Sequence, residues 1–322
     1  MSEHFLDGSV TQPFWDNAVT PRLEINPGDT VTFDCPEPCG QVTPEWTDEM
    51  LANIDFAPIH ALVGSVYVKD AKLGDALQVD ILDFKHKSWA WSGHLQHFGL
   101  LADDFDFAYI HHWKLEGEQC IFGVQDIVLP FEPFCGCMGV APQEPGRIDT
   151  IAPGKFGGNM DVRDLRMGTR MWLPVFVDGA LFACGDCHSG QGNGELCGTG
   201  IESPMTVTLR FDVRKDISVK ELEFETPSPL SKTDAGGYHV TTANGPDLME
   251  NAKNAARYMI DWMVNTYDLT RSQAYVLCST AGDLKISEIV DAPNFIVSAY
   301  MPLSIFKNKL GRLSHRTMQR SD

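Results

Sequence analysis

With 322 residues, of which 43% are hydrophobic, the chain can bury a substantial core in one large domain or in two to three smaller ones. Its formal net charge of -19 argues against nucleic acid and anionic membranes as partners. No apolar run approaches the roughly 18 residues of a membrane span and the N-terminal residues lack the apolar core of a secretion signal, so we expect a cytoplasmic protein.

The first 150 residues are predicted to be rich in β-strands. Leu23–Ile25 and Thr30–Phe33 flank a turn at 26–29, which predicts a strand and its returning partner. The apolar segments 66–68 and 77–82 predict a second β-hairpin.

The rest of this portion is rich in histidine between 86 and 112 and in proline and glycine between 129 and 146. Five of the ten histidines lie between 86 and 112, and of the neighbours His111 and His112 at most one can point inward from a strand. The prolines and glycines of 129–146 exclude a regular helix, and the low charge of this segment indicates either a pocket wall or an ordinary loop at the edge of the core.

The centre of the chain carries the residues best suited to chemistry. The apolar runs 173–177 and 180–183 flank the turn signal Asp178-Gly179 and predict a β-hairpin. Asp186 and His188 follow directly, and their spacing of two residues places both side chains on one face if the chain stays extended. The sequence therefore predicts that this aspartate and this histidine can bind one ion together.

A glycine-rich loop follows and leads to Glu195 and then to Glu202. Glycine allows the backbone to approach a ligand closely. Carboxylates and imidazoles in such a setting are metal ligands or proton carriers. The plainer alternative is a surface turn with solvated carboxylates.

Nine cysteines, an odd number without a signal peptide, predict reduced thiols that serve mainly as small core residues. They are Cys35, Cys39, Cys120, Cys135, Cys137, Cys184, Cys187, Cys197 and Cys278. Cys184, Cys187 and His188 match the C-x-x-C-H pattern of c-type haem attachment. Because covalent haem requires an exported chain, we expect no haem here.

After residue 215 the pattern becomes partly helical. The alternating segment 205–213 predicts a strand. Residues 245–247 are predicted to start a helix with an apolar stripe, in which Pro246 lies near the first helical position and Asp247 and Glu250 lie in the first turn. Thr270 and Gln273 form a capping box for a second helix, which Gly282 ends. A last strand is predicted at 295–300, and the basic tail from 306 is expected to be peripheral.

The fold class that follows is mainly β, with β-sandwich or barrel-like portions and a smaller C-terminal α/β portion. We expect an N-terminal β-rich portion at 1–150, a central β portion carrying the site at 151–215, and the α/β portion at 216–322.

Several segments together resemble the acetamidase/formamidase family, whose members hydrolyse small amides to an acid and ammonia. The segments are 138–142, 157–161, 173–175, 179–181, 185–188, 191–195 with Glu202, and 281–293. The resemblance extends over nearly the whole chain up to 305. It implies a mostly β fold, a small-molecule amide substrate and a bound divalent metal such as zinc. A homo-oligomer is also expected.

The resemblance singles out six residues, namely Asn159, Asp161, Asp186, His188, Glu195 and Glu202. We assign Asp161, Asp186 and His188 as metal ligands, as in an open three-ligand zinc site. Glu202 or Glu195 would move protons, and Asn159 would orient the amide.

Some positions depart from the family pattern and leave the substrate open. Asn193 stands where the family has an acidic residue, Val63-Gly64-Ser65 where it has Thr-Gly-Pro, and Cys135-Gly136-Cys137 where it has a more aliphatic wall. A bulkier or cyclic amide, such as a lactam, is therefore an alternative to formamide and acetamide.

Two other functions remain open from the sequence. Cys184, Cys187 or Ser189 beside His188 could act as a nucleophile, although no G-x-S-x-G elbow is present. The same acidic cluster could also serve a non-catalytic β-rich protein that binds a metal or another ligand.

Overall fold

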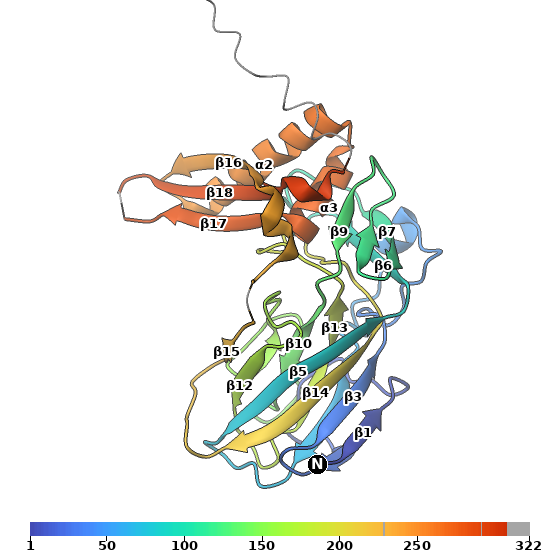
Figure 1. Cartoon of the computed structure of the whole chain (residues 1–322), viewed down its shortest axis with the longest axis vertical. Coiled ribbons are helices and arrows are strands. Elements are labelled where there is room, and N and C mark those ends of the chain that lie inside the picture. Colours follow the sequence, from blue (N-terminus) through green and yellow to red (C-terminus); the bar gives the residue numbers. More distant parts are fainter. Residues whose placement is uncertain (228, 291, 308–322) are drawn as a thin grey trace, which may run out of the picture.

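A computed structural model describes residues 1–227, 229–290 and 292–307 of the chain. The fold is mainly β, as predicted, with a smaller α/β unit at the C-terminal end. Figure 1 shows the β-sandwich below and this unit above it. The basic tail expected to be peripheral lies outside the described residues from 308 onward.

Two sheets form the sandwich. The six-stranded sheet has the order β1-β3-β14-β5-β12-β15. Its strands are β1 (Glu3–Leu6), β3 (Thr30–Cys35), β14 (Met205–Arg214), β5 (Ala76–His86), β12 (Arg170–Pro174) and β15 (Glu223–Glu225). The five-stranded sheet has the order β11-β10-β13-β4-β2. Its strands are β11 (Gly157–Asn159), β10 (Phe134–Gly139), β13 (Phe182–His188), β4 (Val63–Val68) and β2 (Leu23–Ile25).

Phenylalanines hold the two sheets together. Phe182 of β13 packs edge to face against Phe33 of β3, at 6.1 Å between ring centroids, and against Phe211 of β14, at 5.0 Å. All three rings are fully buried. The regular alternation of buried and half-buried residues along β14 fits a strand with one face in this core, whereas β10 and β13 are buried on both faces.

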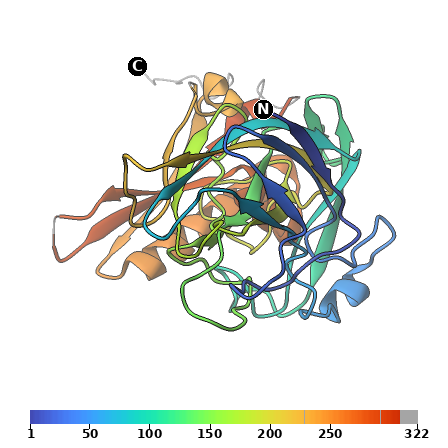
Figure 2. The ribbon, with the colours of Figure 1, turned by 90° about the horizontal axis from the view of Figure 1, so that it is seen from below.

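Two further elements flank the sandwich. A four-stranded sheet has the order β6 (Trp89–His94), β7 (Tyr109–Glu116), β8 (Gln119–Ile121) and β9 (Val128–Pro130). The short helix α1 (Asp48–Ala52) packs beside β7. Figure 2, seen from below, places this blue helix on the side of the molecule away from the orange and red C-terminal strands.

The C-terminal unit is a three-stranded sheet with two helices. Its elements are η1 (Lys232–Gly236), β16 (Tyr238–Gly245), α2 (Leu248–Tyr267), α3 (Arg271–Ala281), β17 (Asp283–Glu288), β18 (Phe295–Pro302) and η2 (Leu303–Ile305). The capping box of Thr270 and Gln273 on α3 and the end of this helix at Gly282 are confirmed. Helix α2 begins later than predicted, because Asp247 is its N-cap and Pro246 lies before the cap. None of the helices in the described ranges is long and apolar enough to span a bilayer.

The hairpin predictions were wrong at all three turns. The strands exist, but β2, β4 and β13 belong to the five-stranded sheet, while β3, β5 and β12 belong to the six-stranded sheet. Each turn therefore carries the chain from one layer of the sandwich to the other. At the central turn, Gly179 is held by β4 and the residues after it, since its carbonyl accepts from Val68 N–H at 2.9 Å and its N–H donates to Ala71 O.

Both layers draw strands from before and after residue 150. The division of the chain into portions at 150 and 215 stays a prediction.

Candidate active site

Strand β13 supplies the first two site residues. Asp186 and His188 lie two residues apart near its end, both buried, with His188 Nε2 3.3 Å from Asp186 Oδ1. The shared face predicted from their spacing is confirmed. Asp186 has a φ of 54°, a left-handed conformation that is uncommon for a non-glycine residue in a strand.

Asp161 reaches the same place from the turn after β11. That turn is fixed by the N–H of Met160, which donates to Gly136 O at 2.9 Å. Asp161 also has a positive φ, 49°, and so does Glu195, at 44°. Backbone strain of this kind persists where the surrounding structure imposes it, and it is concentrated at functional sites.

Gln191 fixes the orientation and tautomer of His188. Its Nε2 donates to Asp161 O at 2.9 Å, so its Oε1 faces His188 Nδ1 at 2.7 Å. Because a carbonyl oxygen only accepts, Nδ1 carries the proton, and Nε2 is directed at the carboxylates. A second partner that fixes a histidine in this way is typical of metal ligands.

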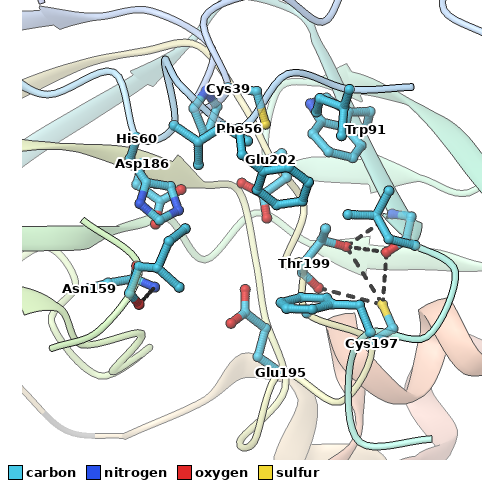
Figure 3. Close-up of a pocket in the computed structure, with 18 of the residues that line it drawn as sticks. Cys39, Phe56, His60, Trp91, Asn159, Asp186, Glu195, Cys197, Thr199 and Glu202 are labelled. Atoms are coloured by element: carbon cyan, nitrogen blue, oxygen red, sulfur yellow. Dashed lines mark hydrogen bonds and ion pairs between the residues drawn. The ribbon is translucent and has the colours of Figure 1, made fainter. Parts of the chain in front are cut away.

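The two glutamates complete the cluster. Glu202 is paired through its backbone with Trp91 of β6, and its Oε1 accepts from Gly200 N–H at 2.7 Å. Its Oε2 lies 3.1 Å from His188 Nε2 but has no hydrogen bond. Atoms of His188, Glu195 and Glu202 lie within 4.8 Å of one another, as do those of Asp161, Asp186 and His188. Figure 3 shows Asp186, Glu195 and Glu202 around one space.

The loop that carries Glu195 is attached to helix α3 as well as to the turn after β11. Ser279 accepts from Gly192 N–H through its carbonyl at 2.7 Å and from Cys197 N–H through Oγ at 3.1 Å. Its hydroxyl donates to Thr199 O at 2.7 Å. One serine thus bonds three positions of the loop, and the C-terminal unit contributes to placing Glu195.

Asn159, predicted to bind substrate, also lines the pocket. Its Nδ2 donates to Ile151 O at 3.1 Å, and its Oδ1 accepts from the Cys137 thiol at 3.1 Å. An amide nitrogen has two donors, so one N–H remains for a ligand. All six predicted site residues therefore line one pocket.

His60 lies in the same pocket and was not predicted. Its Nε2 is 3.9 Å from Asp186 Oδ2, and its Nδ1 is buried without a hydrogen bond. With Cys137 and Asp186 it forms a third group of potential ligands. In the sequence it is a single histidine in an apolar stretch before β4, a context that more often holds a core histidine.

The charges in this cluster shift one another's proton affinity. Burial and the neighbouring Asp186 raise the pKa of Asp161 above its usual range. Burial alone would also raise the pKa of Asp186, but His60, His188 and Cys137, which surround its carboxylate, together outweigh burial and lower it. Burial and the Asp161 charge raise the pKa of Glu195 well above its usual range.

The donor set fits a divalent cation. Ligand atoms of two carboxylates and an imidazole lie within 4.8 Å of one another, and Asp161 Oδ1 and Glu202 Oε2 are buried without hydrogen bonds. Among the described residues that line the pocket, none is lysine or arginine. Unpaired buried carboxylates are costly, and a bound cation compensates them. Oxygen and imidazole ligands with room for a further ligand are compatible with zinc.

The thiols near His188 do not suit catalysis or haem attachment. Cys184 and Cys187 are fully buried, Cys187 Sγ lies 3.6 Å from Cys135 Sγ, and neither lines the pocket. Ser189 Oγ is hydrogen-bonded to Ser203 Oγ at 2.7 Å. The geometry therefore argues against the nucleophile hypothesis.

Comparisons with known proteins give the family and the fold of the chain. A model of the acetamidase/formamidase family matches residues 7–146 and 145–308. An acetamidase of Mycolicibacterium smegmatis is 26% identical over 62% of this chain and 65% of its own length, so the chain spans slightly less than two thirds of that relative.

Two solved structures extend the comparison. A γ-lactamase from Delftia acidovorans has a TM-score of 0.89 at 22% identity, covering 95% of this chain and 94% of its own, which shows the fold. An acetamidase from Bacillus halodurans has a TM-score of 0.66 at 31% identity, covering 95% of this chain and 99% of its own. The chain belongs to the acetamidase/formamidase family of amide hydrolases.

Proposed function

We propose that the chain hydrolyses the C–N bond of a small amide with the help of a divalent metal, and that Asp161, Asp186 and His188 hold the metal. One observation carries the proposal. The ligand atoms of these three side chains lie within 4.8 Å of one another, in a pocket that two glutamates also line. Zinc is the metal that we expect from the donor set.

Amide hydrolysis makes three demands, because resonance stabilises the bond and nitrogen leaves poorly. Water must become nucleophilic, negative charge on the carbonyl oxygen must be stabilised, and nitrogen must receive a proton. A divalent cation would supply Lewis acidity here, lowering the pKa of water to about 7 and polarising the carbonyl.

The two glutamates would divide the proton transfers. Glu202 Oε2 has no hydrogen bond, so it can accept the proton of the attacking water. Burial raises the pKa of Glu195, which makes its carboxyl the better of the two to hold a proton and donate it to the leaving nitrogen. The remaining N–H of Asn159 can orient the amide oxygen.

The substrate would be a formamide- or acetamide-like amide or a lactam. The family name and the M. smegmatis relative favour the acyclic amides, and the similarity in fold to a γ-lactamase makes a cyclic amide the second candidate.

The test is to remove the metal with a chelator, measure it by elemental analysis, and assay ammonia release from formamide and acetamide and ring opening of a γ-lactam. We expect activity to disappear with the metal and to return on adding zinc. Asp186→Asn should lose both metal and activity, whereas Asp178→Asn, at an exposed turn, should lose neither. Full activity of the metal-free protein would refute metal assistance, and metal binding without turnover of any amide would favour a non-catalytic binding protein.

We also propose a cytoplasmic location, which the nine free thiols support, since such thiols suit a reducing compartment. The expected homo-oligomer stays a prediction that sedimentation velocity can test.

A further inference from the structure

The pocket that holds the acidic cluster has two unlike walls. One wall carries the carboxylates and histidines described above, and the other is apolar. The apolar wall is formed by Leu51, Ile54, Phe56 and Ile59 from the segment around α1, and by Trp91 and Leu95 at β6. Figure 3 shows Trp91 on the side of the pocket across from Asn159.

The apolar wall is the pocket side of a separate hydrophobic cluster. Leu51, Ile59 and Trp91 belong to a small core between the α1 segment and the strands β6 and β7, distinct from the main core of the sandwich. Gly93 of β6 permits this packing, because a Cβ there would stand 2.9 Å from Leu51 Cδ2. The wall is therefore a packed surface with its own support.

A buried glutamate fixes this wall in place. Glu37 is 6% exposed, and its carboxylate accepts from the N–H groups of Cys39, Gln41 and Val42 at 3.0 to 3.1 Å. It also accepts from Trp91 Nε1 at 3.0 Å. Three of these donors lie in the loop 39–42 that precedes α1, and the fourth ties this loop to Trp91 of β6, so Trp91 is fixed in the wall.

The size of the pocket exceeds the needs of the simplest amides. Its cavity volume is about 170 Å³. An apolar cavity of about 150 Å³ holds benzene, which has six carbons. Acetamide has one carbon beyond its amide group and formamide has none, so both would leave the apolar wall in contact with water.

We propose that this wall is a subsite for the hydrophobic acyl part of the substrate, and that the chain prefers amides with four to six carbons to acetamide and formamide. The inference rests on the proposed function. In primary amides the carbon chain lies on the acyl side, and in lactams the ring carbons are attached there as well. Each methylene buried against the wall should raise kcat/KM up to about fourfold.

The test is ammonia release from a series of primary amides from formamide to hexanamide, with a five- and a six-membered lactam assayed by ring opening. We expect kcat/KM to rise along the series, by up to about 60-fold from acetamide to pentanamide. A constant or falling kcat/KM beyond acetamide would overturn the subsite but leave the proposed function intact. Loss of all turnover, including that of acetamide, would instead contradict the proposed function.

A pair of matched variants tests the wall itself. Ile54→Trp fills part of the subsite, so the ratio of kcat/KM for hexanamide to that for acetamide should fall at least tenfold. Ile286→Trp makes the same change at an exposed position of β17, outside the pocket, and should leave the ratio as it is. An unchanged ratio in Ile54→Trp would overturn the proposal.

Discussion

Gly136 faces Asp186 across the β10–β13 ladder, and the space left by its missing side chain holds two carboxylates. The flanking pairs Cys135 with Cys187 and Cys137 with Gly185 set this register. A Cβ on Gly136 would overlap Asp186 Oδ2 and would stand 2.5 Å from Asp161 Oδ1.

Gly136→Ala should therefore reduce metal binding and activity while the protein still folds. The overlapping atoms are side-chain ends, which can move, but moving them separates the two proposed ligands. We expect metal affinity and kcat/KM to fall at least about 100-fold, since ligand geometry must hold to about 0.5 Å. Metal content and activity measure the loss at the site, and circular dichroism measures whether the fold is kept. Gly190→Ala is the control, because its Cβ would meet nothing closer than 3.4 Å, and equal losses in both variants would disprove the argument.

Gln191→Leu should weaken the metal site through His188. Leucine cannot accept the Nδ1 proton, so the ring loses its fixed tautomer and orientation. We expect metal affinity to fall about 10- to 100-fold, the usual effect of losing such a partner. Competition titration with a chromogenic chelator measures the affinity. Gln191→Glu keeps an acceptor for Nδ1 and should retain more affinity than leucine; the reverse order would count against this role.

Ser279→Ala should slow the reaction without removing the metal. Ser279 orders the loop of Glu195 but touches none of the proposed ligands, so kcat should fall about tenfold while metal content is kept. Ser272→Ala is the matched control, because this buried serine on the same helix bonds His94 instead. Both variants should lose about 1 kcal/mol of stability. Equal kcat values for the two variants would show that the loop contact does not position Glu195.

The sequence predicted the helix ends well because their determinants are local. Asp247, Thr270 and Gly282 act on backbone groups within a few residues, and Thr270 and Gly282 act as expected, whereas Asp247 caps its helix instead of lying in the first turn. Strand pairing is not local. The turn at Asp178-Gly179 has the composition of a hairpin, but the residues on either side are buried in different layers, and burial in a sandwich does not reveal which strand is the partner.

The site was predictable to the extent that its residues are close in the chain. The two-residue spacing of Asp186 and His188 determined their shared face, whereas His60 reaches the pocket only through the pairing of β4 with β13. Gly192 belongs to the glycine-rich loop before Glu195, whose glycines are expected to let the backbone approach a ligand. Its close neighbour is instead Gly282, whose carbonyl oxygen a Cβ on Gly192 would overlap, so this glycine serves the docking of the loop on α3.

Stability should fall in acid because of buried neutral histidines, and His111 offers the clearest case. The ring is 8% exposed, and its Nε2 donates to Phe122 O at 2.7 Å. Burial lowers its pKa to about 4, below the ordinary value of 6.5. Between pH 6.5 and 4 the unfolded chain therefore binds a proton that the folded chain does not, so the free energy of unfolding should fall as the pH falls through this window, by up to about 3 kcal/mol.

Urea unfolding at a series of pH values tests this expectation with two neighbouring variants. His111→Gln removes the titrating group, so this variant should be less stable at pH 7 yet lose less stability between pH 6.5 and 4. His112→Gln is the control, because the ring of His112 is exposed on the other face of β7 and the variant should keep the slope of the parent protein. If the slopes of all three proteins coincide, the acid sensitivity has another source, and the buried imidazole of His111 is charged in the folded state.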